Sequence, residues 1–279
     1  VPSGTMSNAV AVRTHTQPGD EIIAEEHSHL YVYEGGGYAA LSGCSIGLVP
    51  GHHGLVHPEE VKKRIRKAEG SRSHFPNASL ICLENTSNRG GGTCYTLDTL
   101  NEIGKIAREH DCRMHLDGAR LFNAVVATGN RASELVAMFD SVSVCLSKGL
   151  GAPVGSVLVG SRSFIDQAHR WRKMFGGGMR QSGILAAAGL YALEHNLNRL
   201  KDDHDHARKL AGNLQAIEGL RISMDSVESN MVYVHTEASA VKWQQELEEQ
   251  GVLCFALGEN SLRLVTHLHI DEEKVERAS

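Results

Sequence analysis

Several absences limit what this 279-residue chain can be. No apolar run reaches the roughly 20 residues that span a bilayer, and the first residues lack the basic start and apolar stretch of a signal peptide. Basic residues do not dominate, because 28 Lys and Arg stand against 33 Asp and Glu. A net charge of −5 argues against nucleic acid or an anionic membrane as a partner. We therefore expect a small-molecule partner and a cytoplasmic location. The start at Val1, without an initiating methionine, leaves a mitochondrial location open.

Cysteine pairs of the Cys-x-x-Cys type are also absent, so the six cysteines are expected to be reduced thiols. Histidine is plentiful, with 16 residues, but His204 and His206 are two apart on an expected helix and would not share a face. His27 and His29 could share a strand face, yet no third ligand accompanies them. The sequence therefore predicts no metal site.

Strand-like and helix-like stretches alternate along most of the chain, which predicts an α/β fold around a mostly parallel sheet. Short apolar strands are expected at residues 78–84 and 113–117, with an amphipathic helix between them at 99–110. A third strand at 141–147 is rich in β-branched residues and ends at Lys148. Polar motifs thus follow the carboxyl ends of strands, where open α/β sheets bind ligands.

The composition changes after an Ala-rich helix expected at residues 182–195. A polar segment and a second unit of about 80 residues follow, within the usual range of domain sizes. We therefore predict a large domain over residues 1–196 and a small C-terminal α/β domain over residues 197–279. The elements expected in the small domain are helices at 201–216 and 238–250, strands at 230–235 and 261–266, and a last helix from Asp271 that is cut short.

The beginning of the chain has the pattern of a phosphate cup. A run of small and hydroxyl residues precedes the apolar stretch 9–12 and contains Ser3, Gly4 and Thr5. Free backbone N–H groups, the positive end of the helix dipole and two hydroxyls could together hold a phosphate. Simple capping of the helix by Ser3 or Thr5 is the alternative.

Lys148 follows an apolar strand and is itself followed by Gly149, Gly151 and Pro153. A lysine in a tight, partly desolvated turn can offer a neutral amine that attacks a carbonyl. The glycine spacing fits neither a P-loop nor a dinucleotide-binding fingerprint. A surface lysine in a glycine-rich loop is the alternative interpretation.

Asp117 ends the strand expected at 113–117, and Arg120 lies just beyond it. A carboxylate at the end of a strand can pair with the N–H of a pyridine ring and keep that ring protonated. The guanidinium of Arg120 can donate two hydrogen bonds to a carboxylate or phenolate oxygen. An ion pair between Asp117 and Arg120 would be the purely structural alternative.

Two further residues fit the same kind of site. His29 could stack its imidazole on an aromatic ring, or it could be an ordinary hydrogen-bonded strand residue. Arg263 lies among apolar residues on an expected strand of the second domain, where it either reaches the solvent edge or binds an anion.

In combination these signals occur in the order used by fold-type I pyridoxal-phosphate (PLP) enzymes. The sequence resembles the low-specificity L-threonine aldolases of the β-eliminating lyase group, particularly the animal forms, over essentially the whole chain. The stretches that carry the resemblance are Val1 to Asn8, Glu84 to Thr86, His115 to Arg120, Ser147 to Gly155, Gly176 to Gln181 and Arg263 to His267.

The resemblance implies a fold-type I large domain and a role for each candidate residue. Lys148 would form the Schiff base with PLP, Asp117 would pair with its ring nitrogen, and His29 would stack on the ring. The phosphate would be held by Ser3, Gly4 and Thr5.

For the substrate, the resemblance implies that Arg120 and Arg263 grip the carboxylate of a small amino acid. Lys173 and Arg180 would reach the site of a neighbouring subunit in a homodimer or homotetramer. The implied reaction is retro-aldol cleavage of L-threonine or L-allo-threonine to glycine and acetaldehyde, a step of amino-acid metabolism.

The chain departs from the family pattern in two places. Ser87 stands where the family usually has a histidine near the substrate hydroxyl, and the family's N-terminal arm is not in the sequence. Alternatives therefore stay open: racemisation or β-elimination on the same cofactor, or a catalytically impaired homologue that acts as a binding or subunit protein.

Overall fold

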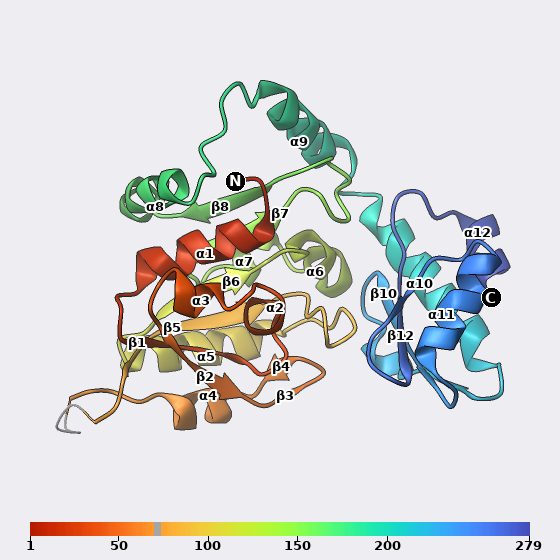
Figure 1. Ribbon diagram of the computed structural model, residues 1–279, viewed down its shortest axis with the longest axis horizontal. Coiled ribbons are helices and arrows are strands. Elements are labelled where there is room, and N and C mark those ends of the chain that lie inside the picture. The colour runs from red at the N-terminus through yellow and green to blue at the C-terminus, as the bar shows by residue number, and fades with distance from the viewer. Residues whose placement is uncertain (70–73) are drawn as a thin grey trace.

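The computed structural model describes residues 1–69 and 74–279 and contains two bodies of sheet and helix (Figure 1). The first body holds a six-stranded sheet in the order β2-β1-β5-β6-β7-β8. Neighbouring strands are parallel except for the antiparallel pair β7 and β8, so the predicted mostly parallel α/β sheet is confirmed. The strands are β1 Asp20–Glu25, β2 Ser45–Val49, β5 Asn77–Glu84, β6 Arg113–Asp117, β7 Ser141–Cys145 and β8 Ser156–Gly160.

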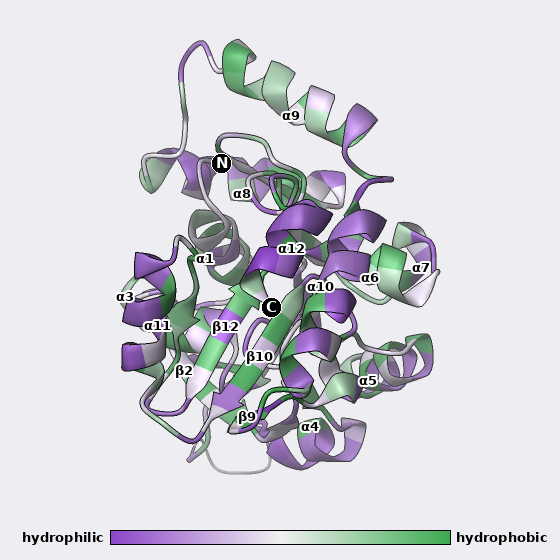
Figure 2. Ribbon diagram, turned by 90° about the vertical axis from the view of Figure 1, so that its right-hand side faces the viewer, coloured by the Kyte–Doolittle hydropathy of each residue, from purple (hydrophilic) through white to green (hydrophobic). Residues whose placement is uncertain are grey.

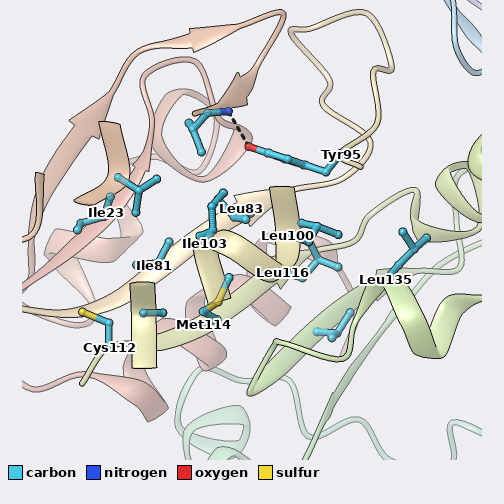
Figure 3. Close-up of a cluster of buried hydrophobic side chains, with 14 of the residues drawn as sticks. Ile23, Ile81, Leu83, Tyr95, Leu100, Ile103, Cys112, Met114, Leu116 and Leu135 are labelled. Carbon is cyan, nitrogen blue, oxygen red and sulfur yellow. Dashed lines mark hydrogen bonds between the residues drawn. The ribbon is translucent and has the colours of Figure 1, made fainter. Parts of the chain in front are cut away.

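Alternate residues of the strands face two different layers of helix. On one face, the helix α5 (Leu97–Glu109) is capped by Thr96, whose hydroxyl accepts from the N–H of Thr99, and buries an apolar stripe against the sheet. Figure 3 shows this core, in which the Tyr95 hydroxyl accepts from the backbone N–H of Val56 at 2.9 Å. Its strand members include Ile81, Leu83, Met114 and Leu116.

On the other face lies α1 (Gly4–His15), with α8 (Arg162–Met174) packed beside it. Val12 of α1 packs against Ile22, Leu80 and Cys82, the strand residues that alternate with those of the first face. The α1 face is where β6 presents His115 and Asp117, because side chains along a strand alternate between faces. The polar motif of β6 and the apolar core of β6 therefore share one strand and point in opposite directions.

Short elements complete the first body. The helix α6 leads away from the end of β6, and a two-stranded hairpin precedes α4. These elements are α2 His29–Val32, α3 Gly37–Ala40, β3 Gly51–His52, β4 Leu55–Val56, α4 Pro58–Arg64, α6 Leu121–Thr128, α7 Ala132–Leu135 and α9 Gly183–His195.

The second body is built on a four-stranded sheet in the order β11-β12-β10-β9, with antiparallel neighbours. Its apolar cluster is separate from that of the first body and includes Leu210, Val232 and Leu262. The division into domains at residue 196 stays a prediction. The elements of this body are α10 Leu200–Gln215, β9 Leu220–Arg221, a short 3-10 helix Met224–Ser226, β10 Met231–Thr236, α11 Ala240–Glu249, β11 Phe255–Ala256, β12 Ser261–Val265 and α12 Glu272–Ala278.

Two local expectations were wrong. The strand expected at 141–147 ends at Cys145, so Lys148 lies three residues beyond it in a bend rather than at its end. His29 is not a strand residue, because β1 ends at Glu25 and His29 opens the short helix α2. Both differences arise because a strand ends where its ladder of backbone hydrogen bonds ends, which residue type does not specify.

The helix α9 stands apart from the sheets in Figures 1 and 2. It carries large apolar side chains that are mostly exposed, including Ile184, Leu190 and Tyr191. Among the described residues, no helix is both long and apolar enough to cross a membrane.

A buried histidine joins the two bodies. The ring of His204 on α10 lies 3.0 Å from the side-chain amide nitrogen of Asn123 on α6, and burial lowers the pKa of His204 to about 4.

This lowered pKa predicts a loss of stability in acid. The imidazole of His204 binds a proton more readily in the unfolded chain than in the folded one, so the free energy of unfolding should fall as the pH drops from about 6.5 to about 4 and level off below. We expect His204→Gln to reduce this acid sensitivity by an amount on the order of 2 kcal/mol, measured by urea unfolding at pH 7 and pH 4.5. An unchanged pH dependence in the variant would contradict this assignment.

Candidate active site

The candidate site lies where the parallel strands reach their carboxyl ends. The register places Glu84 of β5 opposite Asp117 of β6, and Asp117 opposite Ser143 of β7. Lys148 follows three residues after the end of β7. Three neighbouring strands thus bring two carboxylates and the segment of the lysine to one edge of the sheet. This is the edge where open α/β sheets bind ligands.

The amino end of α1 reaches the same edge. Ser3 caps this helix, since its hydroxyl accepts from the N–H of Met6, and as the first two helical residues Gly4 and Thr5 have no acceptor within the helix for their own N–H groups. A Cβ on Gly4 would lie 2.8 Å from the sulfur of Cys145, so only glycine lets the helix approach β7 this closely. The hydroxyl of Ser3 therefore caps α1, while the N–H groups of Gly4 and Thr5 stay available for an anion. The two interpretations of this segment are compatible.

Asp117 is a buried carboxylate held by neutral donors. Its Oδ2 accepts from the amide Nδ2 of Asn8 at 2.7 Å, and its Oδ1 accepts from the backbone N–H of Ala119 at 3.1 Å. Within the described part of the chain no ion pair joins Asp117 to Arg120, so the structural alternative raised for this pair does not hold. A buried anion without a cationic partner favours a positively charged ligand.

His29 is oriented by a second buried carboxylate. Its Nδ1 lies 2.9 Å from Oε1 of Glu34, and the same oxygen accepts from Nδ2 of Asn8 at 2.8 Å. The hydrogen bond to Glu34 raises the pKa of His29, whereas burial raises the pKa of Glu34. Asn8 therefore links Glu34, which directs His29, to Asp117.

Glu84 ties the His29 segment to the loop after β5. Its two carboxylate oxygens accept from the backbone N–H groups of His29, at 2.9 Å, and Asn88, at 3.0 Å. Burial, and secondly the charge of Asp117, raises the pKa of Glu84 to about 7. One side chain thus holds the start of α2 to the loop after β5.

Two guanidinium groups from different bodies meet near these carboxylates. Arg120 precedes α6, and burial, followed by the charge of Arg263, lowers its pKa. Arg263 on β12 donates from Nη1 to Oδ1 of Asn88 at 2.9 Å, while its buried Nε has no partner among the described residues. Two neighbouring cations with an unpaired donor are suited to a carboxylate ligand.

Ser87 is buried in the loop after β5, and its hydroxyl accepts from the backbone N–H of Gly90 at 3.1 Å. A Cβ on Gly54 would lie only 1.9 Å from this hydroxyl, so the space around Ser87 is already filled. A cavity of about 320 Å³ adjoins the loop, and its lining includes Arg89 and Tyr233. The tight packing means that a histidine at position 87 would require its neighbours to move.

Lys173 and Arg180, the residues expected to reach a neighbouring subunit, are not part of this constellation. Both are exposed, Lys173 in the last turn of α8 and Arg180 in the segment that leads to α9. Their roles stay predictions.

His29, Glu34 and Asp117 bring ligand-type atoms within 4.8 Å of one another, as do Glu25, Glu26 and His27. In the first group the amide of Asn8 donates to both carboxylates, which favours a hydrogen-bonded network there. The second group is an acidic cluster at the end of β1. The expected absence of a metal stays a prediction.

Sequence reasoning did not single out Asn8, Glu34, Glu84 or His115 as members of the site. One signal was available for His115, which lies two residues before Asp117 and must share its face of the strand. For Asn8 the available signal was its place one turn after Gly4 on the same helix. Glu84 opens one of the stretches that carry the family resemblance, whereas nothing local distinguishes Glu34 from other acidic residues.

Solved structures share this architecture. A threonine aldolase from Leishmania major superposes with a TM-score of 0.84 at 22% identity, covering 99% of this chain and 80% of the other. The serine palmitoyltransferase of Sphingomonas wittichii superposes with a TM-score of 0.73 at 20% identity, covering 99% and 68%. At these identities the likeness establishes the fold, and the predicted fold-type I architecture is confirmed.

The fold and this carboxyl-edge site define an α/β enzyme, and family membership follows from the sequence comparisons. The model of the family described as beta-eliminating lyase matches residues 1–237, and the chain belongs to this family of lyases. A relative named low-specificity L-threonine aldolase 1, from Arabidopsis thaliana, is 43% identical over 99% of this chain and 78% of its own length. The low specificity L-threonine aldolase of Escherichia coli O157:H7 is 41% identical over 99% and 80%. The resemblance inferred from the motifs is confirmed.

Proposed function

We propose that the protein cleaves L-threonine or L-allo-threonine to glycine and acetaldehyde with pyridoxal phosphate as its cofactor. The names of the relatives support the reaction. The observation that carries the cofactor is Asp117, a buried carboxylate at a strand end whose donors are all neutral. A protonated pyridine ring supplies the missing positive charge.

Unpartnered polar groups at the same edge fit a large polar ligand. Buried side-chain atoms of Ser7, Asn85, Thr86 and Ser143 have no hydrogen-bond partner among the described residues. Such groups are costly unless a ligand or water satisfies them. The chemistry of the remaining groups also fits, because an amine, an open helix N-terminus and a carboxylate match the aldehyde, phosphate and ring nitrogen of pyridoxal phosphate.

In this proposal Lys148 holds the aldehyde carbon, Asp117 holds the ring nitrogen, and His29 lies against the ring. Ser3, Gly4 and Thr5 hold the phosphate at the start of α1. When bound, the cofactor provides the electron sink for the bond broken at the substrate's Cα.

The other groups orient the substrate and move its proton. Arg120 and Arg263 bind the carboxylate, which fixes the bond from Cα to Cβ relative to the ring and so selects the bond that breaks. Because Nδ1 of His29 faces Glu34, its Nε2 is the nitrogen available to accept the proton of the β-hydroxyl. Ser87 supplies no such base, so we assign this role to His29.

The decisive experiment mixes the purified protein with pyridoxal phosphate, records the visible absorbance band, and measures acetaldehyde from L-threonine and L-allo-threonine with a coupled dehydrogenase. A band with acetaldehyde supports the proposal, and the ratio of the two rates gives the preference. A band without acetaldehyde would instead support racemisation, β-elimination or an impaired homologue. No band would overturn the cofactor assignment.

The arginine assignment predicts a change in KM. Arg263→Ala removes charge-assisted hydrogen bonds to the substrate carboxylate, each worth about 1.5 to 3 kcal/mol, so KM should rise roughly 10- to 150-fold with a smaller effect on kcat. Arg263→Lys keeps the positive charge but loses the paired donors of the guanidinium, so its KM should lie between those of wild type and Arg263→Ala. Arg221→Ala, an exposed arginine of β9 in the same sheet, is the matched control and should leave KM unchanged. Equal KM values in Arg263→Ala and wild type would rule the role out.

We also propose that the protein forms a homodimer or homotetramer through the segment that includes Lys173, Arg180 and α9. The exposed apolar side chains there support it, since Ile184 is 85% exposed and Met174 60%. Sedimentation of wild type and Ile184→Glu tests this, and an unchanged molecular mass in the variant would count against this surface.

The six free cysteines suit a reducing compartment such as the cytoplasm, which cell fractionation can test.

A further inference from the structure

A chain of buried polar side chains runs between α1 and the sheet, from Asp117 to the far end of the helix. Asn8 contacts Asp117, His115 contacts Asn8 at 3.1 Å, Ser141 contacts His115 at 2.8 Å, and His15 contacts Ser141 at 2.8 Å. The strand register accounts for one link, because His115 of β6 lies directly opposite Ser141 of β7. Asn8, His115 and Ser141 are each at most 1% exposed.

The direction of every hydrogen bond in this chain follows from the two carboxylates. Nδ2 of Asn8 is the only side-chain atom of that residue able to donate, and it lies at 2.7 Å from Asp117 and 2.8 Å from Glu34. The Oδ1 of Asn8 then faces His115, whose Nε2 must carry a proton and donate. A reversed amide would place an oxygen against two carboxylates and leave both without a donor.

The remaining protons follow by the same reasoning. Burial lowers the pKa of His115 to about 4, so its ring is neutral and Nδ1 holds a lone pair. Ser141 donates its single proton to that nitrogen and accepts from Nε2 of His15. Burial lowers the pKa of His15 to about 3, so this ring is neutral as well. Every donor in the chain therefore points toward Asp117 and Glu34.

We propose that Asn8 is a positioning residue whose amide fixes two partners at once, Asp117 toward the ring nitrogen of the cofactor and Glu34 toward His29, and that His115 locks the direction of this amide. The proposal deepens the function proposed above and rests on it for the identity of the ring. Asn8 touches neither the cofactor nor the substrate in this assignment. It acts through its hydrogen bond, which holds the carboxylate of Asp117 in place beside the other carboxylates, Glu34 and Glu84.

The first test needs no cofactor. In the apo protein labelled with 15N-histidine, the ring signals of His115, assigned by their loss in His115→Gln, should show a neutral imidazole with its proton on Nε2 at pH 7. A ring protonated on Nδ1 instead, or on both nitrogens, would overturn the donor and acceptor roles assigned along this series of hydrogen bonds.

The second test follows the ring nitrogen of 15N-labelled pyridoxal phosphate in the holoenzyme at pH 7. Asn8→Asp replaces the donor shared by Asp117 and Glu34 with a third carboxylate. The repulsion raises the proton affinity of Asp117, so the proton should move from the ring nitrogen toward Asp117 and the ring signal should shift toward that of neutral pyridine. Asn230→Asp is the matched control, because Asn230 is also buried and its amide donates to a backbone carbonyl, that of Thr266. An unchanged ring signal in Asn8→Asp would overturn the proposal.

Substitutions at His115 keep the test decisive if Asn8→Asp does not fold. His115→Gln can still donate to Oδ1 of Asn8 and should preserve the ring signal, whereas His115→Leu cannot and should move it toward the neutral position. Identical signals in these two variants would contradict the locking role. A wild-type protein that takes up no pyridoxal phosphate would count against the proposed function instead. The tautomer of His115 in the apo protein would then be the test of whether His115 fixes the orientation of the Asn8 amide.

Discussion

Replacing Lys148 by alanine is expected to remove the visible absorbance band of bound pyridoxal phosphate and nearly all acetaldehyde formation. The amine of Lys148 is the nucleophile that we assign to the cofactor's aldehyde, and no other lysine was assigned to this edge of the sheet. Loss of a residue that acts within a covalent catalytic unit costs on the order of 10⁴-fold or more in kcat. The band is measured by absorbance spectroscopy and the rate by the coupled dehydrogenase assay.

Lys201→Ala provides the comparison for this variant. Lys201 is an exposed lysine of α10 paired with Asp205, so its loss should leave the band and the rate unchanged. A band that persists in Lys148→Ala at wild-type intensity would eliminate Lys148 as the covalent residue.

The second large effect is expected at Asp117. Asp117→Asn keeps the size of the side chain but removes the negative charge that would hold a proton on the ring. Preorganised electrostatic groups of this kind contribute on the order of 10²- to 10³-fold each, and we expect kcat to fall by that amount while the cofactor still binds. The measurement is the steady-state rate at saturating cofactor, together with the absorbance of the bound form.

Asp140→Asn is the matched control for Asp117→Asn. Asp140 also lies beside the central strands, where it accepts from the backbone N–H of Met114, but it is at the opposite edge of the sheet. A loss of rate as large in Asp140→Asn as in Asp117→Asn would assign the effect to stability rather than to the ring.

Much of the fold could be predicted because hydrophobic periodicity reports directly on burial. The strand Arg113–Asp117 was predicted with its observed bounds, and the other elements for which a range was expected agree within a few residues. Several elements, among them the strands β1, β2 and β8 and the helix α8, were not predicted. The errors lie where periodicity is silent. The bend from Leu146 to Lys148 and the short helix at His29 are set by backbone hydrogen bonding at the strand ends, which no side-chain pattern encodes.

The candidate site was predicted unevenly for a related reason. Asp117 and Lys148 could be found because Asp117 ends a strand and Lys148 follows one, and the carboxyl ends of parallel strands meet at one edge. Asn8 was not found, since an asparagine within a helix usually indicates a solvated position and its place one turn after Gly4 is a weak signal; only the docking of α1 on β6 buries it. Glu34 and Glu84 each bind one neighbour in the sequence and one distant partner, Asn8 for Glu34 and His29 for Glu84, so their place in the site depends on the tertiary structure.

The interleaving of core and site on the same strands limits how this protein can change in evolution. In β6, Met114 and Leu116 support the apolar core while His115 and Asp117 form the polar network on the opposite face. Inserting or deleting one residue before Met114 would exchange the two sets and ruin both at once. Length variation among descendants of this sequence should therefore be confined to loops, whereas the central strands should change only by substitution.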